Sequence, residues 1–152
     1  MMFYLIGLPR CRTAWFANLF TYGSIVCDHD RPNGGDGYSG TVLLDEATRV
    51  PSVYIHRPVW EVMDSIKARF EFPVWADFDA LERALEEQAK RMRECPGFHV
   101  EHKDLDIGSI AAIWEFLLKT PADLGRIRRM MNFNVQVNYN RILDSLKVSQ
   151  EV

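Results

Sequence analysis

The sequence predicts an α/β fold in which a short, mostly parallel sheet lies between two layers of helices. Apolar or β-branched runs of strand length recur along the chain, and amphipathic segments with helical spacing separate most of them. The first run, residues 2–8, is apolar throughout, which is typical of a strand buried on both faces of a parallel sheet. The predicted order is strand, helix, strand, strand, helix, helix, strand, helix.

The other predicted strands are also short and rich in β-branched or aromatic residues. They cover residues 24–27, 52–56 and 98–101. Residues 31–40 contain four glycines and are expected to form a loop. Residues 41–44 either continue this loop or form a short element of their own.

Five segments have the apolar spacing of a helix with one buried face. They cover residues 13–22, 59–70, 77–94, 107–118 and 123–131. Thr13 is expected to cap the first of them, and Pro58 suits the start of the second. The periodicity fades from Asn132 onward, so we expect a single domain over residues 1–131 and a C-terminal extension or tail over residues 132–152.

Composition narrows the class of protein. A chain of 152 residues with a net charge of −3 has enough length for one core and no basic excess that would suggest nucleic-acid binding. Its three cysteines contain no CxxC pair, which favours a reduced compartment over a disulfide scaffold. We find no signal-peptide pattern and no apolar run near the roughly 18 residues of a membrane span. A cytoplasmic monomer or homodimer without a membrane partner is therefore expected.

The loop that follows the first strand is the predicted binding site. In parallel α/β sheets, ligands bind beyond the carboxyl ends of the strands, and a helix N-terminus there offers unpaired N–H groups and a positive dipole end. This loop adds the guanidinium groups of Arg10 and Arg12 and the hydroxyl of Thr13. The stretch from Gly7 to Trp15 is therefore expected to bind the phosphates of a nucleotide.

The loop does not match the Walker A pattern GxxxxGK[ST]. Counted from Gly7, Arg12 stands at the second glycine and Thr13 at the lysine. The strand over residues 52–56 ends in His56 without the aspartate that usually binds Mg²⁺. A magnesium-dependent ATPase or nucleotide kinase is disfavoured, although a P-loop phosphotransferase stays open as an alternative.

Another pattern matches better. The loop resembles the 5′-phosphosulfate loop of the P-loop-type sulfotransferases that use 3′-phosphoadenosine-5′-phosphosulfate (PAPS), typically P-[KR]-S-G-T-[TS]-W. The matching residues are Pro9, Arg10, Thr13 and Trp15, whereas Cys11, Arg12 and Ala14 replace a serine, a glycine and a hydroxyl residue.

A second motif is similar to the same family. Its members have an arginine after the third strand and a serine eight residues later, in the form R-[DE]-P-x-x-x-x-x-S, which together hold the 3′-phosphate. Arg57 and Ser65 have the same separation, with Pro58 one place early and no acidic residue beside it. Residues 100–105, with Glu101 and Leu105, loosely resemble the family's y-E-D-L segment.

The resemblance implies a role for each of these residues. Arg10 would be the catalytic basic residue at the oxygen that bridges phosphate and sulfuryl group. The loop over Pro9, Cys11, Arg12, Thr13 and Ala14 would bind the 5′-phosphate, and Trp15 would lie near the adenine unless it belongs to the core. Arg57 and Ser65 would bind the 3′-phosphate. The implied donor is PAPS, with adenosine 3′,5′-bisphosphate as product and no metal.

The acceptor must lose a proton, so a general base is expected near the donor. His29 follows the second strand and is the candidate, with Asp30 and Asp28 as fallback bases; the alternative is a surface histidine. His56 is a candidate to orient Arg57. A helix N-terminus beside two arginines should also lower the pKa of the Cys11 thiol. A C-x5-R phosphatase loop is excluded because position 17 is Ala17.

The acceptor itself is expected to be a small molecule or a glycan. Two segments are candidates to bind it: the glycine-rich residues 31–40 and the aromatic residues 70–78, which could equally form a dimer contact or a core edge. Among the basic residues Arg126, Arg128 and Arg129, one could reach the 3′-phosphate, or all three could lie on a solvated helix face. Besides a sulfotransferase and a P-loop phosphotransferase, a nucleotide-binding module without catalysis remains open.

Overall fold

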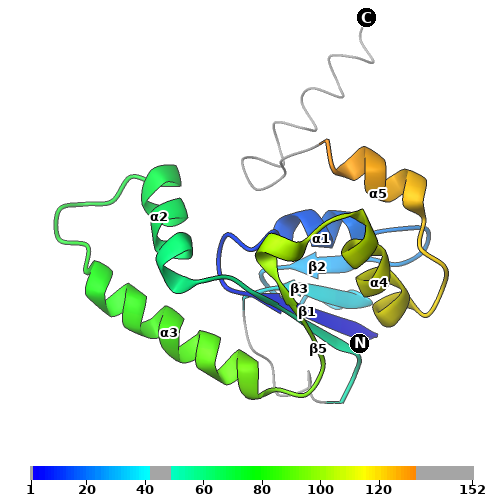
Figure 1. The fold of residues 1–152 in the computed structure, drawn as a ribbon, viewed down its shortest axis with the longest axis horizontal. Helices are drawn as coiled ribbons and strands as arrows, with labels where there is room; N and C mark the ends of the chain where they lie inside the picture. Colours follow the sequence, from blue (N-terminus) through cyan, green and yellow to red (C-terminus); the bar gives the residue numbers. More distant parts are fainter. Residues whose placement is uncertain (1, 42–48, 133–152) are drawn as a thin grey trace, which may run out of the picture.

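The computed structural model describes residues 2–41 and 49–132, which form an α/β fold (Figure 1). The described residues contain a five-stranded, all-parallel sheet with strand order β2-β3-β1-β4-β5. The strands are β1 (Phe3–Gly7), β2 (Cys27–His29), β3 (Gly37–Gly40), β4 (Ser52–His56) and β5 (Phe98–Glu101). The predicted α/β fold with a parallel sheet is therefore confirmed.

The helices are α1 (Thr13–Phe20), α2 (Val59–Arg69), α3 (Phe78–Glu94), α4 (Ile107–Leu118) and α5 (Leu124–Met130). Each lies within two residues of its predicted range at both ends. Sequence signals explain several ends: the Asp77 side chain accepts the Ala80 N–H, and Asp106 and Ser109 form a reciprocal capping box at the start of α4. No helix in the described parts of the chain is long and apolar enough to cross a membrane.

The centre of the sheet is apolar on both faces, as the sequence of β1 predicts. All five residues of β1 and all five of β4 are buried. On one face, the ring of Phe20 packs against those of Phe3 and Trp114, at centroid distances of 5.6 and 5.8 Å, which joins β1 to α1 and α4. The opposite face carries Tyr4 and Tyr54, because successive side chains of a strand alternate. Helix α3 contacts β4, and α2 packs on α3.

Strand β3 was not predicted, because it lies inside the glycine-rich segment that was assigned to a loop. Its glycines have a packing role. A Cβ at Gly37 would overlap the ring of Phe3, and one at Gly40 would overlap the ring of Tyr38. The prediction of a strand over residues 24–27 was also misplaced, since β2 begins at Cys27.

The connection between β2 and β3 is only seven residues long, residues 30–36. Parallel neighbours usually need a crossover of a dozen or more residues. Here one carboxylate oxygen of Asp28 accepts the N–H groups of Asn33 at 2.6 Å and Gly35 at 2.8 Å. The carboxylate of Asp36 accepts the Val26 N–H at 2.9 Å. These bonds fold the chain back within the short distance and fix where β2 ends.

Residues 42–44 of the predicted short element lie outside the described residues. The same holds for the predicted C-terminal extension beyond Asn132.

Candidate functional site

The carboxyl ends of the five strands bring the predicted site residues to one edge of the sheet. The loop with Arg10 and Arg12 follows β1, whereas His29 ends β2 and Arg57 follows β4. Strand β1 lies between β3 and β4, so the chain leaves β1 toward one side and β4 continues on the other. Such a switch in strand order is where open α/β sheets bind ligands.

The loop after β1 has an unusual backbone. Arg10 has φ 67° and Arg12 has φ 64°, both in the left-handed region that non-glycine residues adopt infrequently. The sulfotransferase pattern has glycine at the position of Arg12, and glycine adopts this conformation most readily. Arg12 thus keeps a backbone suited to glycine while adding a cation.

Arg12, rather than the predicted Thr13, is the N-cap residue of α1, and no side chain caps this helix. The first intrahelical bond runs from the Phe16 N–H to the Arg12 carbonyl at 3.0 Å. The N–H groups of Thr13, Ala14 and Trp15 therefore have no acceptor within the helix. They lie at its positive end, beside the arginine side chains.

The two motifs found in the sequence are in direct contact. Arg10 donates from Nε to the Ser65 hydroxyl oxygen at 3.1 Å. Arg57 donates from Nη1 to the Arg10 carbonyl at 2.6 Å and pairs through Nε with Glu61 at 3.3 Å. Direct hydrogen bonds therefore join the loop after β1 to Arg57 after β4 and to Ser65 in α2.

The arginines crowd one another. Burial, followed by repulsion from Arg69 and then Arg57, lowers the pKa of Arg10 below its ordinary value. Burial and then Arg57 lower the pKa of Arg12 in the same way. Four guanidinium groups therefore repel one another here, and a bound anion would relieve that repulsion.

Arg69 was not among the predicted site residues. It stands one helical turn after Ser65 on α2, so the two side chains share a helix face. Its position four residues after Ser65, the serine that accepts a hydrogen bond from Arg10, is the feature of the sequence that could have indicated Arg69 as a site residue.

His29 and Asp30 lie beside the loop. His29 Nε2 is 3.2 Å from the Thr13 hydroxyl oxygen and 3.4 Å from a carboxylate oxygen of Asp30. Burial lowers the pKa of His29, and the charge of Asp30 opposes that effect only in part. This lowering favours the neutral imidazole, which is the form that a general base requires. Asp28, the other fallback base, instead holds the β2–β3 connection.

A pocket of about 290 Å³ joins the loop to His29. That volume is close to the lower end of the roughly 300–1,000 Å³ of ligand sites. Seven predicted site residues line it, together with Phe70, from the aromatic segment that was a candidate for binding the acceptor, and Thr41, which the sequence analysis did not assign to the site. The lining residues are Pro9, Arg10, Arg12, Thr13, Ala14, His29, Asp30, Thr41 and Phe70.

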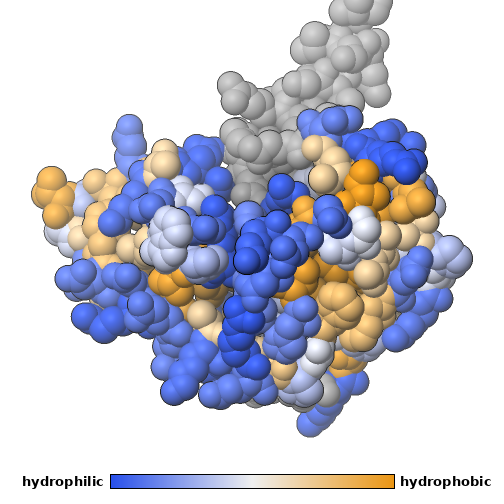
Figure 2. Space-filling view, in the orientation of Figure 1, coloured by the Kyte–Doolittle hydropathy of each residue, from blue (hydrophilic) through white to orange (hydrophobic). Residues whose placement is uncertain are grey.

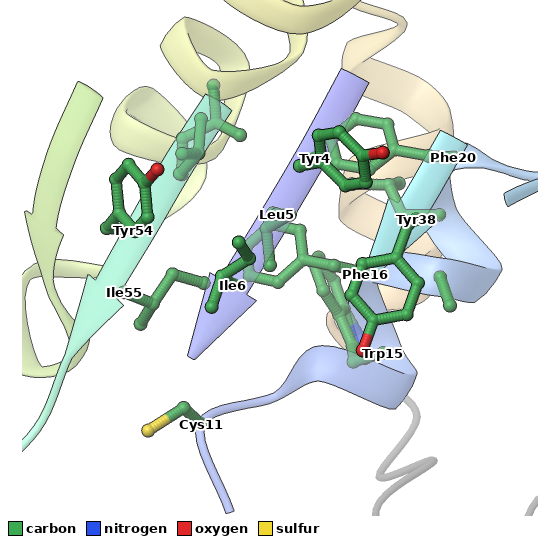
Figure 3. Packing of buried hydrophobic residues seen from close by; sticks show 14 of the residues in the cluster. Tyr4, Leu5, Ile6, Cys11, Trp15, Phe16, Phe20, Tyr38, Tyr54 and Ile55 are labelled. Atoms are coloured by element: carbon green, nitrogen blue, oxygen red, sulfur yellow. The ribbon is translucent and has the colours of Figure 1, made fainter. Parts of the chain in front are cut away.

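Two of the predicted site residues are buried in the core instead: Cys11 in the loop and Trp15 in α1 (Figure 3). Cys11 is fully buried, and burial raises the pKa of its thiol to about 12. The predicted lowering of this pKa is wrong, because loss of solvent outweighs the charge of the nearby Arg57. Trp15 is 3% exposed, and its indole N–H donates to the Met130 carbonyl at 2.8 Å. Trp15 therefore joins α1 to the end of α5 and does not line the pocket.

Two other residues considered in the sequence analysis, His56 and Arg126, have structural roles. His56 Nε2 lies 2.7 Å from His99 Nδ1, so His56 contacts β5 rather than Arg57. Arg126 donates to the carbonyl oxygens of Asn18, Leu19 and Thr21 and so closes the end of α1. Among the described residues, no group of three or more His, Cys, Asp or Glu is arranged to hold a metal ion.

A scan against models of known protein families finds no match for this chain, and searches of curated proteins and of solved structures find none either.

Proposed function

We propose that this chain is a sulfotransferase-like enzyme that transfers a sulfuryl group from PAPS to a hydroxyl or amine acceptor. The observation that supports this best is the contact between Arg10 and Ser65. These residues belong to two motifs 55 positions apart in the sequence, and the resemblance assigned them to the two phosphate sites of one donor. Arg57 joins the same cluster through the Arg10 carbonyl.

The residues present suit a donor with several negative charges. Guanidinium groups bind phosphate or sulfate oxygens bidentately, and the cluster supplies Arg10, Arg12 and Arg57. The N–H groups at the start of α1 add donors that need no reorganisation. In this proposal, the loop and Arg12 hold the 5′-phosphate while Arg57 and Ser65 hold the 3′-phosphate.

The proposed transfer exchanges one sulfur–oxygen bond for another. The acceptor oxygen or nitrogen attacks sulfur, and the bond from sulfur to the bridging oxygen breaks. That oxygen leaves with its electron pair as part of adenosine 3′,5′-bisphosphate, and Arg10 stabilises the charge that develops on it. His29 takes the proton of the acceptor, so the products are the sulfated acceptor, the bisphosphate and a protonated imidazole.

Calorimetric titration with adenosine 3′,5′-bisphosphate in the presence of EDTA tests the donor site. We expect binding without magnesium, weakened at least tenfold by Arg57→Ala and by Arg10→Ala, because each variant removes a charged donor. Arg128→Ala is the matched control, since Arg128 is an exposed arginine of α5.

The outcomes separate the candidate functions. Magnesium-dependent ATP binding without affinity for the bisphosphate would favour a phosphotransferase and contradict the proposal. Binding of the bisphosphate without sulfuryl transfer from PAPS to any tested acceptor would favour a nucleotide-binding module without catalysis and contradict the proposed enzymatic activity. If neither the bisphosphate nor ATP raises the melting temperature of the protein, the assignment of a donor site to this loop is itself contradicted.

A further inference from the structure

Three phenylalanine rings form a continuous surface beside the pocket, which we call the aromatic shelf: Phe70, Phe72 and Phe78. The ring centroids of Phe70 and Phe72 are 6.5 Å apart, and those of Phe72 and Phe78 are 5.1 Å apart, both in edge-to-face geometry. Phe70 is 50% exposed and Phe72 39% exposed. Phe78 is partly buried against the core. Rings of this size usually lie in a core, so two exposed rings beside a partly buried one mark a surface suited to an apolar ligand.

The shelf is continuous with the proposed reaction site. Phe70 lines the same pocket as Arg10 and His29. It follows α2 directly, and α2 carries the Ser65 hydroxyl that accepts the Arg10 hydrogen bond. A molecule lying on the shelf would thus present one end to the pocket that contains the proposed base.

Two cations flank the shelf. The Arg69 guanidinium carbon lies 5.7 Å from the centroid of the Phe70 ring, and Lys67 Nζ lies 4.9 Å from that of Phe78. Apolar ring faces bordered by two positive groups complement a molecule that is both flat and negatively charged. The same cations oppose a contact between the shelves of two copies of this chain, because like charges would meet.

We propose that the aromatic shelf binds the acceptor, and that the acceptor is an aromatic or similarly flat apolar molecule that carries an anionic group. Its ring system lies on Phe70 and Phe72, its anionic group pairs with Arg69 or Lys67, and its reacting hydroxyl or amine enters the pocket toward His29. The assignment of this ligand as the acceptor rests on the proposed sulfotransferase function. The α2–α3 connection continues beyond the shelf, and Figure 2 shows hydrophobic residues at its tip.

Fluorescence titration with two dyes tests the class of ligand. The dye 1-anilinonaphthalene-8-sulfonate has an aromatic body and an anionic group, and N-phenyl-1-naphthylamine has the same ring system without the sulfonate. We expect Phe70→Ala to weaken binding of both dyes about fivefold or more, because half of this ring is available for contact. Arg69→Gln should weaken only the sulfonate, by about threefold, and added salt should reduce that difference.

Trp75→Ala is the control for general loss of exposed aromatic surface. Trp75 is 81% exposed in the same α2–α3 connection, beyond the shelf. It should leave the affinity for both dyes unchanged. An equal loss in Trp75→Ala and Phe70→Ala, together with binding that depends on protein concentration, would identify the tip as a contact between copies and overturn the proposal.

Competition with nucleotide separates the shelf from the donor site. Saturating adenosine 3′,5′-bisphosphate should leave the sulfonate dye bound. Displacement of the dye would place it on the arginine cluster and overturn the proposal, as would unchanged affinity in Phe70→Ala. Shelf-dependent dye binding in a chain that binds no bisphosphate would refute the sulfotransferase function alone, while the shelf would remain a site for this class of ligand.

Discussion

Replacing Arg12 with glycine should stabilise the free protein and weaken its binding of nucleotide. Arg12 has φ 64°, a conformation that costs an L-residue roughly 1–2 kcal/mol and costs glycine little. The extra freedom of glycine in the unfolded chain offsets about 0.4–1 kcal/mol of that gain. Removing a half-buried cation near Arg57 acts in the stabilising direction as well.

The net gain from Arg12→Gly is about 1 kcal/mol in the free energy of unfolding. For a chain of this length, that corresponds to a rise of about 2–4 °C in melting temperature. The opposite effect is expected on binding. Loss of one charged donor to a phosphate costs about 1.5–3 kcal/mol, or roughly a 10- to 100-fold weaker affinity for adenosine 3′,5′-bisphosphate. Scanning calorimetry and isothermal titration measure the two effects.

Two further variants separate the contributions of backbone and charge. Arg12→Ala removes the cation but keeps a side chain in the left-handed region, so it should lose affinity without the backbone gain. Lys119→Gly relieves the same backbone conformation, φ 59°, at the end of α4, and should raise the melting temperature with affinity unchanged. A drop in melting temperature for Arg12→Gly, or an unchanged affinity, would refute the reasoning.

Three other predictions concern the base, a helix end and a buried histidine. His29→Ala should reduce turnover by about 10²–10⁴-fold with the affinity for bisphosphate retained. In the parent, kcat/KM should rise with pH, and the midpoint of that rise should lie below the ordinary histidine pKa of about 6.5, since burial lowers the His29 pKa. Full turnover in this variant would move the base elsewhere. Arg126→Ala should lower the melting temperature by several degrees, because three carbonyl oxygens at the end of α1 lose their donor, whereas Arg128→Ala should not. His56 has a pKa of about 4 in the folded protein, lowered by burial, then by Arg93 and His99, with Glu101 opposing. The unfolded chain therefore binds more protons between pH 6.5 and 4, and stability should fall over that range by at most about 1.4 kcal/mol per pH unit for this group. Denaturant titrations at several pH values measure this dependence. In His56→Gln, the free energy of unfolding should change less steeply with pH between 6.5 and 4, and an unchanged pH dependence would assign the effect to another group.

Periodicity predicted the fold where one physical effect controls the local structure. Residues 59–70 and 107–118 became α2 and α4 because a single apolar stripe decides which face of each helix is buried. Strand β3 was not predicted because Gly37 and Gly40 are required there by close contacts with the rings of Phe3 and Tyr38. Such contacts depend on partners far away in the sequence, and the composition of the segment resembles that of a loop.

The candidate site was predictable in part for the same reason. Spacing along the chain was sufficient to pair Arg57 with Ser65, and topology was sufficient to bring His29 near the loop. Neither indicates which way a side chain points. The structure was therefore needed to show that Cys11 of the loop is buried, and that Trp15 lies on the buried face of α1 rather than beside the ligand. The aromatic run over residues 70–78 was a candidate for the acceptor, but which of its rings would reach the pocket required the structure, where Phe70 at the end of α2 lines it.

The seven-residue link between β2 and β3 has a consequence for engineering this protein. Surface loops usually accept insertions or new chain ends, and a glycine-rich segment would be the obvious place to introduce them. Here the backbone of Asn33 and Gly35 is tied to Asp28, which directly precedes the proposed base His29. A cut or an added peptide between residues 31 and 35 would release that tie. Circular permutation should therefore succeed more readily when the new chain ends are placed in the α2–α3 connection, at the exposed residues Val74 and Trp75.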